Sequence, residues 1–343
     1  MKTLCAIGEA LIDFIPNETG VRLKDVSGFQ RAAGGAPANA AGAVGKLGGQ
    51  ARFLTKLGKD AFGDYIISCL DQCHVETDHI IRTDAYDTSL AFVSLAGDAD
   101  RDFKFYRRTA ADLQYDPKDM DDRVLDDCGC IHFCSVSLVE SPMKQAHKKL
   151  IKKALEKKVR ISFDPNLRLS LWNDDLACRE TIREFLPYAD ILKLSDDELF
   201  FITGYETIEE ALSMLFSGRC EFLLYTMGKK GARLYRRHAA PLEVPGIAVH
   251  AVDTTGAGDS FIGAFLYCLL ADEMPDFDKI DDRCLQRYLT FANAYAACTA
   301  SRKGALANLA DRTEFQAFLN AYQIPLSLTD FSVPKAQEKS HEC

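Results

Sequence analysis

A glycine-rich turn that leads into an apolar helix carries the clearest chemical signal in the chain. It runs Val252-Asp253-Thr254-Thr255-Gly256-Ala257-Gly258-Asp259-Ser260-Phe261. The two glycines let the backbone approach a ligand closely, and the unpaired N–H groups of the first helical turn attract negative charge. A carboxylate there, Asp259, opposes an anion unless it accepts a proton from an attacking hydroxyl while those N–H groups stabilise a transferred phosphoryl group. The alternative is that Asp259 only complements the helix dipole.

A second glycine pair precedes another expected helix, in Ala33-Gly34-Gly35-Ala36-Pro37-Ala38-Asn39. The chain can approach a small ligand there, and the amide of Asn39 offers one acceptor and two donors to a sugar hydroxyl. Asn39 is also an ordinary helix N-cap. Asp13 ends the first expected strand, where carboxylates line the ligand crevice of open α/β sheets. A lone acid is more often a surface residue, and both interpretations of Asp13 stay open at this point.

A third turn, Thr226-Met227-Gly228-Lys229-Lys230-Gly231, joins two expected strands. Its backbone N–H groups and lysines suit phosphates, but a hairpin with a basic tip explains the same residues. The chain contains no Gly-x4-Gly-Lys-Ser/Thr segment and no Gly-x-Gly-x-x-Gly segment. This argues against a P-loop NTPase, a protein kinase and a dinucleotide-binding dehydrogenase, so phosphates must be held on another scaffold.

The composition excludes several classes of partner. The chain has 343 residues, of which 47% are apolar and 27% charged, and its formal net charge is −9. An acidic chain without long Lys/Arg runs offers no general surface for a polyanion, so we expect no nucleic-acid partner. No apolar run approaches the ~20 residues of a membrane span. Glu9 and Asp13 interrupt the apolar opening segment, so we expect no secretory signal and predict a cytoplasmic protein with reduced thiols.

One dense group of potential metal ligands comprises Cys128, Cys130, His132 and Cys134. It lacks the paired cysteine spacing that structural zinc favours. The run from Cys130 to Cys134 is typical of a buried strand, and we predict a strand over 130–135 and no metal site.

Short apolar runs alternate with amphipathic stretches along the chain, which is the pattern of βα units around a mainly parallel sheet. The expected strands are 4–7, 52–57, 130–135, 160–164, 191–194, 222–227 and 232–235. The expected helices are 39–47, 62–72, 142–157, 197–203, 208–216, 260–271 and 284–300. Two ribbons of mixed polarity, about 16–31 and 88–106, break the alternation, and we expect them to form a small second sheet that covers a site. The polar tail 331–343 is expected to be disordered.

Taken together and in this order, these segments resemble the ribokinase (PfkB) family of carbohydrate kinases over about residues 1–325. The segment 34–39 is similar to the family's N-terminal signature, and 253–259 is similar to its highly specific C-terminal signature. Two further segments, Arg101-Asp102-Phe103-Lys104-Phe105-Tyr106-Arg107 and Asp164-Pro165-Asn166-Leu167-Arg168, look most like fructokinases within the family. The resemblance implies a three-layer αβα domain over 1–330, with a mainly parallel central sheet and a small β-sheet lid from the two ribbons.

The resemblance also implies roles for individual residues. Asp259 would be the catalytic base, and the N–H groups of Gly256, Ala257, Gly258 and Asp259 would form the anion hole. The sugar would be held by Asp13, Gly34, Gly35, Asn39, Phe105 and Arg168. ATP would be contacted by Lys193, Thr226, Gly228, Gly231 and Asn293.

Two metal sites follow from the resemblance. Mg²⁺ is required on physical grounds, because the ATP phosphates need a hard cation. The family often has Asn-x-x-Glu where this chain has Ser195-Asp196-Asp197-Glu198, so the magnesium role transfers to Glu198 in preference to Ser195. A K⁺ site is implied at Asp253, Thr255 and Gly304, although Asn308 stands where the family commonly has Ser.

We therefore predict an ATP-dependent sugar kinase that phosphorylates the 6-hydroxyl of fructose. Alternatives on the same scaffold are a 2-keto-3-deoxygluconate kinase, which Arg107 keeps open as a cation for a sugar acid, and an aminoimidazole riboside kinase. An alternative of another class is a sugar- or nucleotide-binding regulatory protein without turnover. The family resemblance further implies a homodimer through the lid.

Overall fold

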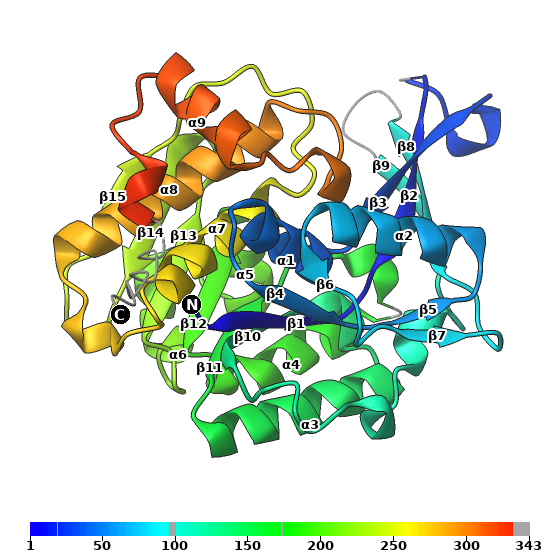
Figure 1. Cartoon of the computed structure of the whole chain (residues 1–343), viewed down its shortest axis with the longest axis horizontal. Helices are drawn as coiled ribbons and strands as arrows, with labels where there is room; N and C mark the ends of the chain where they lie inside the picture. The colour runs from blue at the N-terminus through cyan, green and yellow to red at the C-terminus, as the bar shows by residue number, and fades with distance from the viewer. Residues whose placement is uncertain (19, 96–100, 173, 332–343) are drawn as a thin grey trace, which may run out of the picture.

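The computed structural model describes residues 1–331 except 19, 96–100 and 173. In this part of the chain, nine strands form one large sheet in the order β15-β14-β13-β12-β11-β10-β1-β4-β6 (Figure 1). The strands are β1 (Thr3–Ile7), β4 (Ala51–Leu54), β6 (Val75–Glu76), β10 (Cys128–Cys134), β11 (Arg160–Asp164), β12 (Ile191–Ser195), β13 (Phe222–Thr226), β14 (Gly231–Tyr235) and β15 (Leu242–Pro245). All neighbours pair in parallel except at the edge, where β13 with β14 and β14 with β15 are antiparallel.

Helices cover both faces of this sheet and make three layers. On one face lie α1 (Ala36–Lys46), α2 (Ala61–Gln72), α7 (Ala257–Ala271), α8 (Asp282–Ala300) and α9 (Arg312–Ala321). On the other lie α3 (Pro142–Lys157), α4 (Asp175–Phe185), α5 (Asp196–Thr203) and α6 (Ile208–Leu215). Alternate residues of β1 enter the two cores: Leu4 packs with the first group of helices and Cys5 with the second. A strand buried on both sides must be apolar throughout, which explains the short apolar runs in the sequence.

A four-stranded sheet projects from one end of the large sheet, beside α2 (Figure 1). Its order is β3-β2-β8-β9, with β2 (Leu11–Pro16), β3 (Phe29–Gly34), β8 (Ser89–Leu95) and β9 (Arg101–Tyr106). We call these four strands the lid sheet. β5 (Lys56–Gly58) and β7 (Ile81–Thr83) form a separate parallel pair.

The prediction of an αβα fold with a mainly parallel sheet and a smaller second sheet is confirmed. The first ribbon was misplaced: the strands lie at Leu11–Pro16 and Phe29–Gly34, and the stretch between them is a loop with one short 3-10 turn, Leu23–Asp25. The prediction for the tail lies almost entirely outside the described residues. Its first residue, Phe331, is buried, and its ring centroid lies 4.5 Å from that of Phe291.

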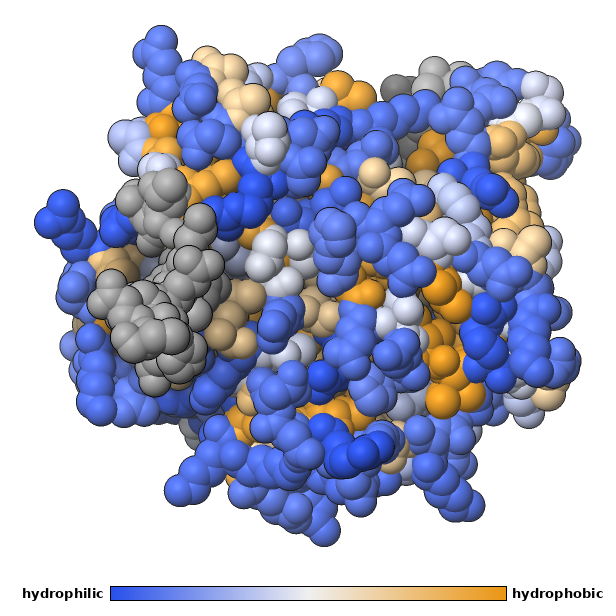
Figure 2. Space-filling view, viewed as in Figure 1, coloured by the Kyte–Doolittle hydropathy of each residue, from blue (hydrophilic) through white to orange (hydrophobic). Residues whose placement is uncertain are grey.

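Hydrophilic side chains dominate the face shown in Figure 2, and apolar side chains appear there only in small groups. None of the helices in the described ranges combines the length and apolarity that crossing a bilayer requires.

Candidate active site

Asp259 lies in the first turn of α7 and is 6% exposed. Gly256 precedes this helix with a φ of 77°, in the left-handed region that glycine adopts without strain. The helix therefore starts abruptly, and the N–H groups of its first turn have no carbonyl partner within the helix. The N–H of Ala257 already donates to the carbonyl oxygen of Thr254 at 3.2 Å, so the other N–H groups of this turn are the ones that an anion could engage, with a carboxylate beside them.

Two amides hold the carboxylate of Asp259. The Nδ2 of Asn39 donates to Oδ2 at 2.8 Å, and the Nδ2 of Asn166 donates to Oδ1 at 2.5 Å. Asn39 is buried in the first turn of α1, and its Oδ1 atom is buried without a protein partner. A buried acceptor of this kind is costly unless a ligand donates to it. Asn39 can therefore join the base to a hydroxyl of a bound molecule.

Asn166 is a site residue that we did not predict from the sequence. It follows β11 in the segment Asp164-Pro165-Asn166, is 6% exposed and has a φ of 45°. Its N–H donates to Oδ1 of Asp164 at 3.2 Å. Asparagine tolerates this left-handed conformation better than most residues, because its short polar side chain bonds locally. A polar residue just after a buried strand was the available signal, but only the fold reveals its distance to Asp259.

Asp13 lies on β2 against the glycine pair. A Cβ on Gly34 would lie 2.6 Å from Oδ2 of Asp13, and a Cβ on Gly35 would lie 2.3 Å from the carbonyl oxygen of Glu9. Burial raises the pKa of Asp13 to about 7; the charge of Arg168 opposes this shift, and Asp253 and Asp259 add to it. The glycines therefore serve close packing between β2 and the start of α1, and this packing places Asp13 near Asp259.

Phe105 shares a face of the lid sheet with Asp13. Asp13 pairs with Ala91 and Ala91 pairs with Phe105, so the three lie in one cross-strand row. The adjacent row points the other way: Phe14 stacks on Phe92 with ring centroids 4.6 Å apart. One face of the lid sheet thus carries Asp13 and Phe105, and the opposite face carries the rings of Phe14 and Phe92. We call the opposite face the aromatic face.

Lys193 forms a buried ion pair below the start of α7. Its Nζ lies 3.1 Å from Oδ1 and 3.0 Å from Oδ2 of Asp164, and both residues are buried. A Cβ on Gly258 would lie 3.2 Å from this Nζ. Burial opposes the charge, but Asp164, Glu198 and Asp259 outweigh it and raise the pKa of Lys193 above its ordinary value. A fixed positive charge therefore lies directly under the predicted anion hole.

The side chain of Glu198 forms a capping box with Ser195 at the N-terminus of α5, the helix to which Glu198 belongs. Its Oε2 accepts from the N–H of Ser195 at 2.9 Å and from Oγ of Ser195 at 2.7 Å, and its Oε1 accepts from the N–H of Leu167 at 2.6 Å. Burial works against ionisation, but the charge of Lys193 and these hydrogen bonds outweigh it and lower the pKa of Glu198. The carboxylate is ionised and fixed, although these three donors already occupy part of its capacity.

Four of the residues predicted to contact ATP lie toward the β14–β15 edge of the large sheet: Thr226, Gly228, Gly231 and Asn293. Thr226 ends β13 opposite Ser195 of β12, so it lies beside the start of the helix that carries Glu198. Gly228 and Gly231 have φ values of 52° and 106° in the turn that follows. A Cβ on Gly231 would lie 2.0 Å from the carbonyl oxygen of Val244, so packing alone requires this glycine.

Asn293 belongs to the same region. It lies on α8, and its Nδ2 donates to the carbonyl oxygen of Pro245 at 2.9 Å, while Pro245 pairs with Gly231. The structure therefore brings Asn293, which is partly buried, toward the turn after β13 and beside the edge strand β15.

Asp253 connects the two segments predicted to bind K⁺. Its Oδ1 accepts from the N–H of Thr255 at 2.9 Å, and its Oδ2 accepts from the N–H of Gly304 at 3.1 Å. Gly304 has a φ of 98°, and a Cβ there would lie 2.5 Å from Nδ2 of Asn308. This carboxylate thus fixes two loops beside the start of α7.

Arg168 follows β11 and is exposed. Its Nη1 donates to the carbonyl oxygen of Leu167 at 2.9 Å, and its charge acts on Asp13. It is an exposed cation close enough to Asp13, on the lid sheet, for its charge to act on that carboxylate.

The cluster of potential zinc ligands forms strand β10, as predicted. His132 is buried, its Nδ1 lies 3.0 Å from Oγ of Ser162, and burial lowers its pKa to about 3. In the described ranges, no group of three or more His, Cys, Asp or Glu side chains has the arrangement of a metal site.

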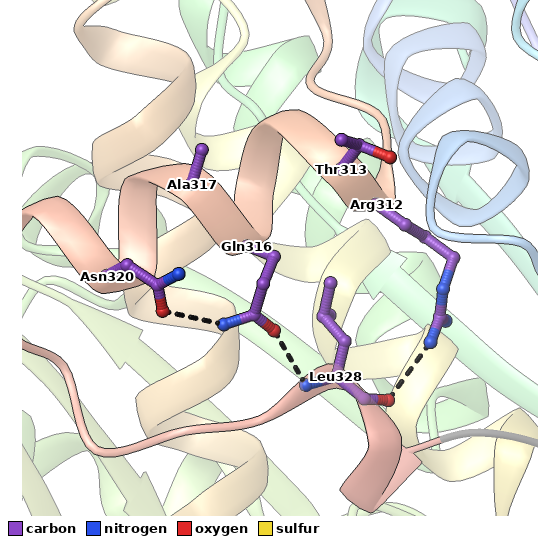
Figure 3. Close-up of a pocket in the computed structure, with 6 residues that line it drawn as sticks. All are labelled: Arg312, Thr313, Gln316, Ala317, Asn320 and Leu328. Carbon is purple, nitrogen blue, oxygen red and sulfur yellow. Dashed lines mark hydrogen bonds between the residues drawn. The ribbon is translucent and has the colours of Figure 1, made fainter.

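A groove along α9 lies away from this site (Figure 3). Its polar side chains bond within the groove: Gln316 donates to Oδ1 of Asn320 and accepts from the N–H of Leu328, and Arg312 donates to the carbonyl oxygen of Leu328. Groups already satisfied in this way leave little for a ligand, so the groove is not a second candidate.

Comparison with known proteins agrees with this geometry. The model of the pfkB family of carbohydrate kinases matches residues 1–312. A probable fructokinase-4 of Arabidopsis thaliana is 39% identical over 317 residues, which cover 92% of this chain and 96% of that protein. A fructokinase structure from Xylella fastidiosa with bound ATP has a TM-score of 0.84 and 32% sequence identity. The match covers 94% of this chain and 99% of the Xylella chain.

A second structure is that of a doubly substituted fructokinase from Vibrio cholerae O395 with fructose, ADP and a potassium ion bound. Its TM-score is 0.81 at 29% sequence identity, and the match covers 93% of this chain and 98% of the Vibrio chain. This chain belongs to the pfkB family of carbohydrate kinases. It is a phosphotransferase that acts on a sugar hydroxyl.

Proposed function

We propose that the enzyme is a fructokinase that transfers the γ-phosphoryl group of ATP to the 6-hydroxyl of fructose. The observation that carries this proposal is the buried carboxylate of Asp259, held by two amides at the start of α7. Fructokinase relatives and neighbours with fructose, ADP or ATP bound support the choice of substrates.

Asp259 accepts the proton of the acceptor hydroxyl, whose oxygen then bonds to the γ-phosphorus as ADP leaves. The N–H groups from Gly256 to Asp259 and the charge of Lys193 stabilise the negative charge on the transferred group. Asn39, Asp13 and the backbone of Gly34 and Gly35 hold other sugar hydroxyls. A closed lid sheet, with Phe105 on its inner face and Arg168 at its rim, excludes water and so prevents wasteful ATP hydrolysis.

The nucleotide would lie along the ends of β12, β13 and β14, against Thr226, Gly228, Gly231 and Asn293. Mg²⁺ would neutralise charge on the ATP phosphates, and a fixed ionised carboxylate such as Glu198 fits this role. Because Glu198 already accepts from Ser195 and Leu167, it would act through metal-bound water.

A K⁺ ion fits beside the anion hole, where Asp253 brings together the loops of Thr255 and Gly304. When bound there, K⁺ would supply positive charge next to the start of α7. We expect higher turnover in potassium chloride than in lithium chloride at equal ionic strength; equal turnover in both salts would contradict this site.

One observation favours fructose over a sugar acid. Arg107, the cation that a sugar carboxylate would need, is 5% exposed and forms an ion pair with Asp112. Its charge is therefore already compensated. An aromatic surface for a riboside would have to come from Phe105, so the riboside remains the second candidate.

The substrate proposal is tested by measuring ADP release with fructose, glucose, ribose, 2-keto-3-deoxygluconate and aminoimidazole riboside. Fructose should give the highest kcat/KM. A higher value for any other acceptor would withdraw fructose as the substrate and leave the family assignment in place.

Asp13 should make sugar binding depend on pH. Because its pKa is about 7 when buried, Asp13 is mostly protonated at pH 6 and mostly ionised at pH 8. Only the ionised form accepts hydrogen bonds with both oxygens, so the KM for fructose should fall as the pH rises between these values. Asp13→Asn should bind fructose more weakly with a KM that is flat over this range. The same pH dependence in both proteins would rule Asp13 out as its source.

Asn166→Gly should lower kcat about 10- to 100-fold, since a hydrogen bond to a charged group contributes about 1.5–3 kcal/mol. Glycine tolerates the φ of 45°, so the variant removes the amide but not the backbone conformation. Asn166→Ala is the comparison. It should lose a similar amount of activity, and its Tm should be lower than that of Asn166→Gly because alanine is strained at this φ. Wild-type turnover in Asn166→Gly would show that the amide does not position Asp259.

We also propose that residues 1–330 form one kinase domain in the cytoplasm, where ATP is available, and that the lid sheet mediates a homodimer. Tyr106, on the aromatic face of the lid sheet, is 59% exposed and lies 5.6 Å from Phe92 between ring centroids. Tyr106→Glu should shift the sedimentation coefficient to that of a monomer; a dimer that persists would exclude this face as the interface.

A further inference from the structure

The chain passes between the large sheet and the lid sheet four times. It enters β2 directly after β1, returns from β3 into α1, enters β8 after β7, and leaves β9 toward the 3-10 turn Ala111–Gln114. Each passage contributes a group to a single buried hydrogen-bond network. This network consists of Glu9, Ala36, Ser89, Arg107, Asp112, Val136 and Ser137, and we call it the hinge network.

Arg107 is at its centre, directly after β9. Its Nε and Nη2 donate to Oδ2 of Asp112 at 2.9 and 2.5 Å, Nη1 donates to the carbonyl oxygen of Val136 at 2.9 Å, and Nη2 donates to Oγ of Ser137 at 3.2 Å. The remaining oxygen of Asp112 accepts from Oγ of Ser89, the first residue of β8, at 2.5 Å. Arg107 thus connects both passages of the second lid ribbon to the loop after β10.

Glu9 connects the other two passages. It lies between β1 and β2 and is 2% exposed. Its Oε2 accepts from Oγ of Ser137 at 2.7 Å, and its Oε1 accepts from the N–H of Ala36, the first residue of α1, at 3.0 Å. Ser137 therefore joins Glu9 to Arg107. Because Asp13 follows Glu9 on β2 and Asn39 follows Ala36 on α1, the network also fixes the two segments that carry sugar-binding candidates.

The placement of these groups is specific to a hinge. The partners of Arg107 lie where the chain passes between the lid sheet and the rest of the domain, and the carboxylate of Asp112 balances its charge there. Small rearrangements in such a network change the angle between two rigid sheets without unfolding either.

We propose that Arg107 is a positioning residue that sets the lid sheet over the acceptor sugar through the hinge network. This proposal rests on the proposed function in one respect, that the lid covers the sugar. The role is distinct from sugar binding, since Arg107 acts through the segments that carry Asp13, Asn39 and Phe105.

Two substitutions separate this role from simple stability. Arg107→Lys keeps a positive charge beside Asp112 but cannot also reach Val136 and Ser137, and Ser137→Ala breaks the link to Glu9 without changing any charge. The matched control is Arg52→Lys: Arg52 of β4 is 8% exposed and bonds to Glu76 of β6 and to Asp127 and the carbonyl oxygen of Val124 just before β10, none of which belongs to the lid sheet.

Each full-length variant is characterised in four ways. Stability is measured as Tm, and nucleotide binding as the Kd for ATP without sugar. Steady-state kinetics give the KM for fructose and the ATP consumed per sugar phosphorylated, and hydrogen exchange is measured for the backbone amides of β2 and β8. Arg107→Lys should raise the KM for fructose about tenfold, since small misplacements of substrate-positioning groups have large effects. It should also increase ATP consumed per sugar and amide exchange in the lid strands, with the Kd for ATP unchanged. Ser137→Ala should shift the same quantities less, and Arg52→Lys should lower only Tm.

The proposal would be overturned if both Arg107→Lys and Ser137→Ala kept the wild-type KM for fructose, the wild-type ATP consumption per sugar and the wild-type hydrogen exchange in β2 and β8. If Arg107→Lys does not fold, Ser137→Ala decides alone. If the wild-type enzyme phosphorylates none of the sugars, the proposed function fails, and lid exchange in the variants still decides whether the hinge network exists.

Discussion

Asp259→Asn should bind ATP normally and lose about 10³- to 10⁴-fold in kcat, the upper range for removal of a general base. An amide has nearly the shape of a carboxylate but only one acceptor oxygen, so one of the two amides of Asn39 and Asn166 can still donate to it while the other loses its acceptor, and no group accepts the proton. Because the proton moves only during reaction, kcat and kcat/KM should fall together. The start of α7 remains intact, and the anion hole should still bind phosphate.

The measurement is a steady-state rate together with a calorimetric titration of ATP. Asp272→Asn is the matched control, since it makes the same change at the other end of α7, where Asp272 accepts from the hydroxyl of Tyr288. Turnover near the wild-type value in Asp259→Asn would remove Asp259 from the role of base, and a loss of ATP affinity would indicate a damaged helix start.

Lys193→Met should be the most destabilising of the substitutions considered, and also nearly inactive. It leaves Asp164 buried without its cation, and breaking a buried pair costs about 3–5 kcal/mol. It also removes the charge under Gly258, so kcat should fall about 10²- to 10³-fold, as for the loss of one electrostatic contact to the transition state.

The two effects are separated by a second substitution. Lys193→Met combined with Asp164→Asn should regain part of the stability lost, measured as the free energy of unfolding in urea, because the carboxylate in direct contact with Lys193 is then also neutral. It should not regain turnover. Recovery of both would mean that Lys193 acts only by stabilising the fold.

Much of the architecture could be predicted from the sequence because strands buried on both faces are continuous apolar runs. The strand Arg160–Asp164 and the helix Pro142–Lys157 have the predicted bounds. Helix α4 was not predicted, since its buried side is only Cys178, Ile182 and Phe185 on an otherwise polar segment. The first two lid strands, β2 and β3, were displaced because their alternating polarity does not differ from that of the loop between them, whereas β8 and β9 lie within the predicted second ribbon.

Asp259 and Asn39 could be proposed as site residues from the sequence because a local pattern suggests the chemistry of each, and the structure brings the two side chains into contact. The site was not predictable where distant segments meet. The contact of Asn166 with Asp259 joins residues 93 positions apart, and that of Asn39 joins residues 220 apart. Arg107 was interpreted as a cation for a sugar acid, because the sequence does not reveal that Asp112 pairs with it inside the protein.

The order of strands in the large sheet has a consequence for how such an enzyme can change. The residues that we propose for the acceptor sugar, Asp13 and Asn39, come from the β1 end, and those that we propose for the nucleotide, Thr226 and Asn293, come from the β13 to β15 end, with α7 between them. A substitution at one end leaves the packing of the other untouched. Selection can therefore alter which alcohol is phosphorylated while the phosphoryl donor stays the same, so that one scaffold evolves its two specificities independently.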